Sequence, residues 1–203
     1  EMKHLMEEQI IPYLEDKFFT EQVIHSQVIK TCGIGESDLE TKVADIVEEQ
    51  TNPTIALLAD SGEVKLRLTA KADTEEQAAE LIQQEEAKLQ ARIGDYIYGY
   101  NDDTLEQVVA ESLWEQELTI AVAESCTGGL IGHRLTSVPG SSAYFDRGLV
   151  SYSNQAKQEL LGVKETTLEE FGAVSKQTAR EMAVGVKERS ATDIGLATTG
   201  IAG

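Results

Sequence analysis

The sequence predicts an α/β protein built from a small βαββαβ two-layer module and a partial three-layer α/β/α domain with a largely parallel sheet. Two observations support this fold class. In residues 21–100, alternating apolar runs flank two helical patterns, whereas beyond residue 100 buried strands are separated by helices. A length of 203 residues suffices for two such cores. We expect residues 1–20 to be a helical remnant of an upstream domain, 21–100 the small module, and 101–203 a domain truncated at its C-terminal end.

Each element of the first part has a local signal. The helical spacing of apolar residues in 2–14 predicts an amphipathic helix that ends near Pro12. Strands are expected at 22–31, at 54–59 and 63–71 as a hairpin with Leu66 and Leu68 inward, and at 95–99. A capping box that begins at Ser37 predicts the first helix of the module, and Thr74 caps the second, which Gly94 should close in a left-handed conformation.

The second part alternates strands with helices. Thr104 is expected to start a helix, followed by a buried strand at 118–123 and a helix that runs from the 127–129 turn to Ser137. Further strands are expected at 146–152 and 194–198, with helices at 154–161, stopped by Gly162, and at 175–190. This order is typical of a parallel sheet covered on both faces.

Composition argues against several classes of function. Lys and Arg total 17 against 36 Asp and Glu, a net charge of -19, which disfavours nucleic acid and anionic membrane surfaces as partners. No apolar run approaches the roughly 18 residues of a membrane span. Two cysteines and three histidines show no metal-ligand spacing, so we expect neither a metal nor another cofactor. The N-terminus lacks a signal-peptide pattern, which predicts a cytoplasmic location.

A glycine pair in the small module superficially suggests an RNA-binding loop. Gly33 and Gly35 are separated by one residue, whereas the loop of a KH module has two residues between its glycines in a basic setting. Glu36 and Asp38 follow instead, so the sequence disfavours RNA binding.

The first candidate site is the glycine-rich turn of residues 123–129, between a strand and a helix. Such a turn can direct backbone N–H groups at an anion, with the Ser125 and Thr127 hydroxyls as further donors. The alternative is an ordinary tight turn in which Thr127 is the helix N-cap. Cys126 in the same turn is a further candidate nucleophile, because a thiol at a helix N-terminus has a lowered pKa. It has no evident histidine partner.

The second candidate combines Ser142 in a polar turn with Tyr152 and Lys157 around the next strand and helix. A serine needs a base to become a nucleophile, and without a usable histidine that base is a lysine kept neutral by burial, with Tyr152 as a proton relay. Tyr152 and Lys157 fall near the carboxyl end of a strand, where open α/β sheets bind ligands. The alternative is a solvated Lys157 on a helix capped by Ser153 or Asn154.

Five segments in order resemble the C-terminal domain of the CinA family of competence/damage-inducible proteins. They are Ala-Glu-Ser-Cys-Thr-Gly-Gly at 123–129, Pro-Gly-Ser-Ser-Ala-Tyr-Phe-Asp-Arg-Gly at 139–148, Ser-Tyr-Ser-Asn-Gln-Ala-Lys at 151–157, Gly-Ala-Val-Ser at 172–175 and Thr-Gly-Ile-Ala-Gly at 199–203. Residues 1–100 resemble the end of the family's molybdopterin-binding-like domain and the small module that follows it. This resemblance implies a bacterial protein.

The resemblance implies a metal-independent amidase that converts nicotinamide mononucleotide to nicotinic acid mononucleotide and ammonia in pyridine nucleotide salvage. Carried onto this chain, Ser142 is the expected nucleophile and Tyr152 and Lys157 its proton-transfer partners. The expected substrate-binding residues are Ser125, Thr127, Gly128, Gly129, Thr199 and Gly200. We further expect the 125–129 turn to receive the nucleotide phosphate.

The remaining expectations concern partners, the activity of this fragment and an alternative function. A small-molecule nucleotide is the expected substrate, with no nucleic-acid or membrane partner, and we expect a homo-oligomer. In the family this domain continues beyond the position of Gly203 and includes a basic active-site residue, so this fragment alone is expected to be inactive. The alternative function is a non-catalytic nucleotide-binding or protein-interaction module. A buried Lys157 with a shifted pKa beside Ser142 would favour the enzyme, and a solvated one the binder.

Overall fold

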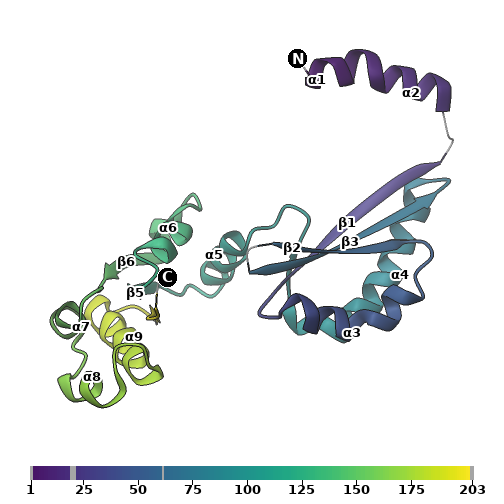
Figure 1. The fold of residues 1–203 in the computed structure, drawn as a ribbon. Coiled ribbons are helices and arrows are strands. Elements are labelled where there is room, and N and C mark those ends of the chain that lie inside the picture. Colours follow the sequence, from purple (N-terminus) through teal and green to yellow (C-terminus); the bar gives the residue numbers. More distant parts are fainter. Residues whose placement is uncertain (1, 19–21, 61, 202–203) are drawn as a thin grey trace. The chain divides into compact units, whose positions relative to one another are not determined.

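The computed structural model of the chain describes residues 2–18, 22–60 and 62–201 and divides into two compact units, Glu1–Asp103 and Thr104–Gly203 (Figure 1). The first unit begins with a helical segment made of α1 (Met2–Leu5), the π-helical turn η1 (Met6–Ile10) and α2 (Ile11–Phe18). The predicted end near Pro12 is wrong, because the helix continues past it. Pro12 has no N–H to donate, and the wider π turns lie directly before it.

The rest of the first unit is a four-stranded antiparallel sheet with two helices packed on one face. In the sheet β1 (Val23–Cys32), β2 (Thr54–Asp60), β3 (Glu63–Ala72) and β4 (Ile97–Tyr100) follow the order β2-β3-β1-β4. The helices are α3 (Glu36–Glu48) and α4 (Glu75–Ile93), so the predicted βαββαβ order is confirmed.

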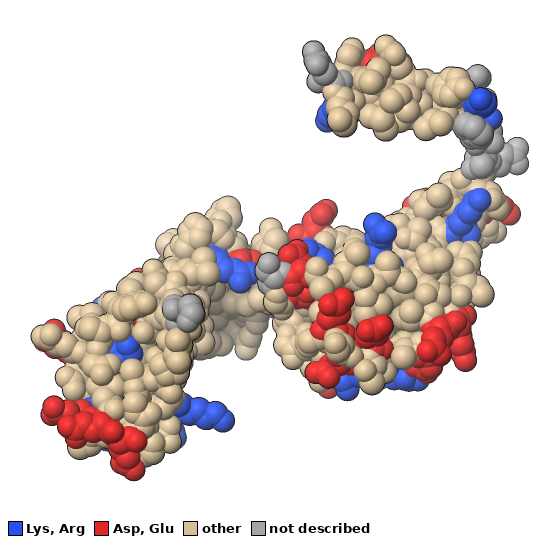
Figure 2. Space-filling model, in the orientation of Figure 1, with Lys and Arg blue, Asp and Glu red and all other residues tan. Residues whose placement is uncertain are grey.

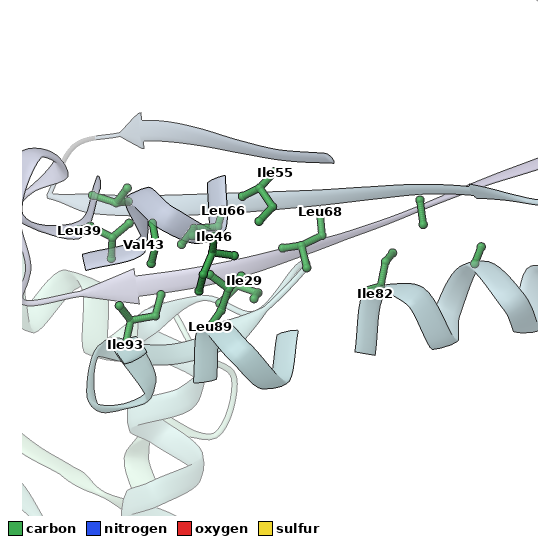
Figure 3. Packing of buried hydrophobic residues seen from close by; sticks show 13 residues of the cluster. Ile29, Leu39, Val43, Ile46, Ile55, Leu66, Leu68, Ile82, Leu89 and Ile93 are labelled. Atoms are coloured by element: carbon green, nitrogen blue, oxygen red, sulfur yellow. The ribbon is translucent and has the colours of Figure 1, made fainter. Parts of the chain in front are cut away.

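The core of this unit lies between the sheet and the helices, as Figure 3 shows. In β3 the predicted alternation holds: Leu66 and Leu68 are fully buried, whereas Arg67 between them is exposed. Leu66 lies opposite Ile29 of β1, and both contact the helical layer, which supplies Leu39 of α3 and Leu89 of α4. Acidic side chains gather over α3 and α4 in Figure 2, consistent with the net negative charge.

Two predicted helix ends differ from the structure. Helix α3 begins at Glu36 after Gly35, which makes no side-chain cap, so the capping box expected at Ser37 does not form. Gly94 has φ -52°, a right-handed value, because the chain tightens there into the 3-10 turn η2 (Gly94–Tyr96) instead of reversing. The cap at Thr74 is confirmed, since its hydroxyl accepts the Gln77 N–H at 3.2 Å.

The second unit is a three-layer α/β structure. Strands β5 (Ile120–Glu124), β6 (Phe145–Val150) and β7 (Ile194–Thr198) form a parallel sheet of order β6-β5-β7. Along β5 the side chains alternate between two cores: Val122 packs with residues of α5 (Leu105–Glu115) and α6 (Leu130–Thr136), and Ala123 with residues of α9 (Lys176–Ser190). The predicted fold class is therefore confirmed.

The remaining elements of this unit are short. The 3-10 turn η3 (Ser141–Ala143) precedes β6, and α7 (Asn154–Leu161) and α8 (Glu165–Phe171) follow it; α8 was not predicted. Ser153 caps α7 and Gly162 ends it with φ 71°, as its position predicted. Within the described ranges, no helix combines the length and apolar character needed to cross a membrane.

Candidate active site

Lys157 is the most unusual polar residue of the second unit, because it is 1% exposed. The Ser153 cap starts α7 and places Lys157 in the first turn of this helix. Its Nζ donates to Ser125 Oγ at 3.0 Å and to the carbonyl oxygens of Ser151 at 2.9 Å and Tyr152 at 3.1 Å. Three acceptors match the three protons of an ammonium group.

The same three partners also determine where the N–H bonds and the lone pair of a neutral Lys157 amine point. A carbonyl oxygen can only accept, so in the neutral form two N–H bonds remain directed at Ser151 and Tyr152. The nitrogen lone pair then faces Ser125, whose hydroxyl becomes the donor across the same 3.0 Å. The neutral amine is therefore placed to accept the hydroxyl proton of Ser125.

The surroundings of Lys157 favour its neutral form. None of the ion pairs formed by the described residues includes Lys157, and its three hydrogen-bond partners are neutral oxygens. Burial lowers the pKa of the Lys157 amine below its ordinary value, while an electrostatic interaction with Cys126 opposes this shift. A lysine with a lowered pKa is a stronger candidate for a general base than a solvated one.

The topology of the sheet brings Ser125 to this amine. Ser125 follows β5 directly, and Ser151 and Tyr152 follow β6, so all three lie at the carboxyl edge of the parallel sheet. Hydrogen bonds continue the strand ladder to this point: the Ser125 N–H donates to Thr198 O at 3.1 Å, and the Ser151 N–H donates to Glu124 O at 2.7 Å. Ser125 is 6% exposed.

The turn after Ser125 leaves two backbone donors unused. Gly128 and Gly129 have φ 61° and 104°, values that favour glycine, and the Gly128 N–H closes the turn on Ser125 O at 3.1 Å. Among the residues that the structure describes, the N–H groups of Cys126 and Thr127 have no acceptor. Donors directly after a serine nucleophile are well placed to bind an oxyanion.

The other expected substrate-binding residues lie at the same sheet edge. The Thr127 hydroxyl hydrogen-bonds to that of Thr198 at 2.8 Å, and Thr199 Oγ1 donates to Ala173 O at 2.8 Å. A Cβ added to Gly200 would lie 3.0 Å from Cys126 Sγ, so the segment after β7 passes close to the 125–129 turn.

The expected pairing of Ser142 with Lys157 is absent from the structure. Ser142 is exposed in η3, before the first residue of β6, whereas the Lys157 amine bonds to residues that follow the last residue of β6. Six strand residues at about 3.3 Å each separate these ends by about 20 Å. Tyr152 contributes its carbonyl to Lys157, while its side chain is 66% exposed and its hydroxyl has no partner among the described residues.

The partner of Lys157 was therefore missed, although a signal for it existed. The rule that places ligands at the carboxyl edge applies to Ser125 as it does to Lys157, since Ser125 directly follows the buried run that ends β5. No group of three or more potential metal-ligating side chains occurs in the described ranges.

Comparison with known proteins places the sequence in one family. Residues 102–203 match the family described as CinA C-terminal domain, and residues 26–99 match the Damage-inducible protein CinA KH domain. A protein of Caldicellulosiruptor bescii named for competence-damage induction is 52% identical over the whole chain, and a CinA-like protein of Dictyoglomus thermophilum is 49% identical. The chain spans 49% of the length of each.

One solved structure is similar in sequence over part of the chain. The competence/damage inducible protein CihA of Agrobacterium tumefaciens is 49% identical, with a TM-score of 0.48, over 49% of this chain and 60% of that one. Fold and site thus define a two-unit α/β protein with a buried serine–lysine pair at the carboxyl edge of a parallel sheet. The chain belongs to the CinA family.

Proposed function

We propose that the second unit is the catalytic domain of an amidohydrolase that converts nicotinamide mononucleotide to nicotinic acid mononucleotide and ammonia. The observation that carries the proposal is the 3.0 Å hydrogen bond between Lys157 Nζ and Ser125 Oγ, buried and without a counter-ion among the described residues. The substrate is inferred from the resemblance to the CinA family. The buried amine favours an enzyme over a module that only binds nucleotides.

In this proposal Ser125, not Ser142, is the nucleophile. Lys157 takes the hydroxyl proton as Ser125 Oγ forms a bond to the carboxamide carbon, and the N–H groups of Cys126 and Thr127 donate to the resulting oxyanion. Lys157 returns the proton to the leaving nitrogen, the C–N bond breaks, and ammonia departs. Water then attacks the ester carbon as Lys157 takes its proton, the C–O bond to Ser125 breaks, and Lys157 gives the proton to Ser125 Oγ as the carboxylic acid is released.

The test is ammonia release from nicotinamide mononucleotide by the full-length protein, its Lys157→Met variant and a matched Lys164→Met control. Lys164 is exposed in the same part of the chain, so its substitution removes a positive charge without touching the pair. We expect release by the wild type and the control and at least a hundred-fold loss in Lys157→Met, because general-base catalysis contributes about 10²–10⁴. Full activity of Lys157→Met, or none in the wild type, contradicts the proposal.

A further inference from the structure

Glu124 is a buried carboxylate that the proposed reaction does not use. It is the last residue of β5 and precedes Ser125, and it is 1% exposed. A carboxylate is expensive to bury unless hydrogen bonds or charges replace its water. Its partners therefore indicate what it does.

The partners are the backbone N–H groups at the start of α6. Glu124 Oε2 accepts from Gly129 and Ile131, both at 3.0 Å, and Oε1 accepts from Gly132 at 2.8 Å. Burial raises the pKa of the Glu124 carboxyl, but a hydrogen bond from the Thr127 side chain and the three N–H bonds outweigh it, so the pKa is lowered. Glu124 is thus a stable anion inside the protein.

This anion occupies the N–H groups that a phosphate at the start of α6 would use. The N–H groups that open α6 are the donors a phosphate would need, and three of them already donate to Glu124. The geometry therefore does not support the expectation that the 125–129 turn binds the nucleotide phosphate through this helix start.

Glu124 also hydrogen-bonds to the segments that hold Ser125 and Lys157. Its side chain holds the turn that follows Ser125, and its carbonyl oxygen accepts the Ser151 N–H at 2.7 Å. The carbonyl of Ser151 is in turn an acceptor for Lys157 Nζ. Gly132 borders this carboxylate as well, since an added Cβ there would lie 3.4 Å from Glu124 Oε1, an ordinary van der Waals distance.

We propose that Glu124 is a positioning residue for the Ser125–Lys157 pair. Its carboxylate fixes the 125–129 turn so that Ser125 Oγ stays against Lys157 Nζ and the N–H groups of Cys126 and Thr127 stay free for an oxyanion. The inference rests on the proposed function, since it assigns a role relative to the nucleophile of that reaction. Glu124 itself touches neither Lys157 nor the reacting atoms.

The chain offers a matched control. Glu181 is also a carboxylate that holds a helix start, because it accepts the Lys164 N–H and the Thr167 hydroxyl, each at 2.8 Å, beside α8. Its pKa is lowered, by the hydrogen bond from the Lys164 N–H first of all. Loss of its charge should also weaken a helix start, by less than at Glu124 because Glu181 is only partly buried, and it should not move Ser125.

The experiment measures kcat, KM and melting temperature of the full-length protein and its Glu124→Gln and Glu181→Gln variants, with nicotinamide mononucleotide as substrate. In Glu124→Gln we expect about a hundred-fold loss of kcat with KM within threefold, as for a reacting group displaced by about 1 Å. Glu181→Gln should lower the melting temperature by less and keep kcat within twofold. Similar kcat values for the two variants refute the positioning role.

Two further variants complete the test. If Glu124→Gln does not fold, Glu124→Asp keeps the charge but is one methylene shorter, so its carboxylate cannot keep the same geometry to the N–H groups of Gly129, Ile131 and Gly132, and kcat should fall severalfold. Unchanged kcat in Glu124→Asp then refutes the inference. Ser125→Ala separates the two proposals: if it retains full activity, the proposed nucleophile is wrong, whereas loss of activity together with an unaffected Glu124→Gln contradicts only the role of Glu124.

Discussion

Gly185 of α9 holds the helix that carries Lys157, and its replacement by alanine gives a sharp test of the packing. A Cβ at this position would lie 1.8 Å from the carbonyl oxygen of Leu161, the last residue of α7. Cβ contacts essentially never fall below 3.0 Å, so the two helices would have to separate by about 1 Å or more. Lys157 lies one turn earlier in α7, and its hydrogen bond to Ser125 would shift with it.

The expected magnitude follows from two opposing effects. Overpacking a core costs about 1–3 kcal/mol, and an overlap with backbone belongs at the upper end of that range. The same substitution in an unconstrained helix stabilises by about 1 kcal/mol. We therefore expect Gly185→Ala to lower the free energy of unfolding by about 2 kcal/mol, although a helix propensity argument alone predicts the opposite sign.

Urea unfolding of the 203-residue chain, followed by Trp114 fluorescence, measures this change. Trp114 is the single tryptophan of the chain and packs edge to face on Tyr144 in the second unit, with ring centroids 5.5 Å apart. Val184→Ala is the control, because its side chain is 46% exposed on the same helix and should change stability by less than about 0.5 kcal/mol. A Gly185→Ala variant as stable as the wild type, or more stable, refutes the packing argument.

Three further predictions concern charge and helix capping. Because burial lowers the pKa of Lys157, kcat/KM for ammonia release should rise with pH and level off on the acid side of 10.5, the ordinary lysine value; a midpoint at or above 10.5 contradicts the role of Lys157 as base. The same shift affects stability, because at pH values between the pKa of Lys157 in the folded protein and 10.5 the amine is protonated only in the unfolded chain. The free energy of unfolding should therefore rise with pH across this window, and Lys157→Met should abolish the rise. Thr104→Ala removes the capping box with Gln107 at the start of α5 and should destabilise the second unit by about 1 kcal/mol in the same urea assay, whereas Asp102→Ala should have little effect.

Local features of the fold could be predicted because their signals are local. The alternation of Leu66, Arg67 and Leu68 defines which side of β3 is buried, and the side chains of Thr74 and Ser153 cap helices within three residues of themselves. The end at Gly94 could not be predicted in the same way, because a glycine permits left-handed backbone without requiring it.

The candidate site depended on contacts between distant segments. Sequence reasoning placed Lys157 at the correct sheet edge but paired it with Ser142, which is close in the chain but lies at the other end of β6. Ser125 lies 32 positions from Lys157, and only the parallel pairing of β5 with β6 brings them together. The contacts of Glu124 could not be predicted either, because its carboxylate accepts from N–H groups that the formation of α6 brings together.

The choice between Ser125 and Ser142 tests the central claim most directly. The measurement is ammonia release from nicotinamide mononucleotide by full-length Ser125→Ala and Ser142→Ala variants, compared at equal protein concentration and with melting temperatures recorded. The account predicts that Ser125→Ala loses activity at least a thousand-fold while it remains folded, since no other hydroxyl in the described part of the chain hydrogen-bonds to Lys157. Ser142→Ala should retain activity within threefold. Loss of activity in Ser142→Ala with an active Ser125→Ala would contradict the account.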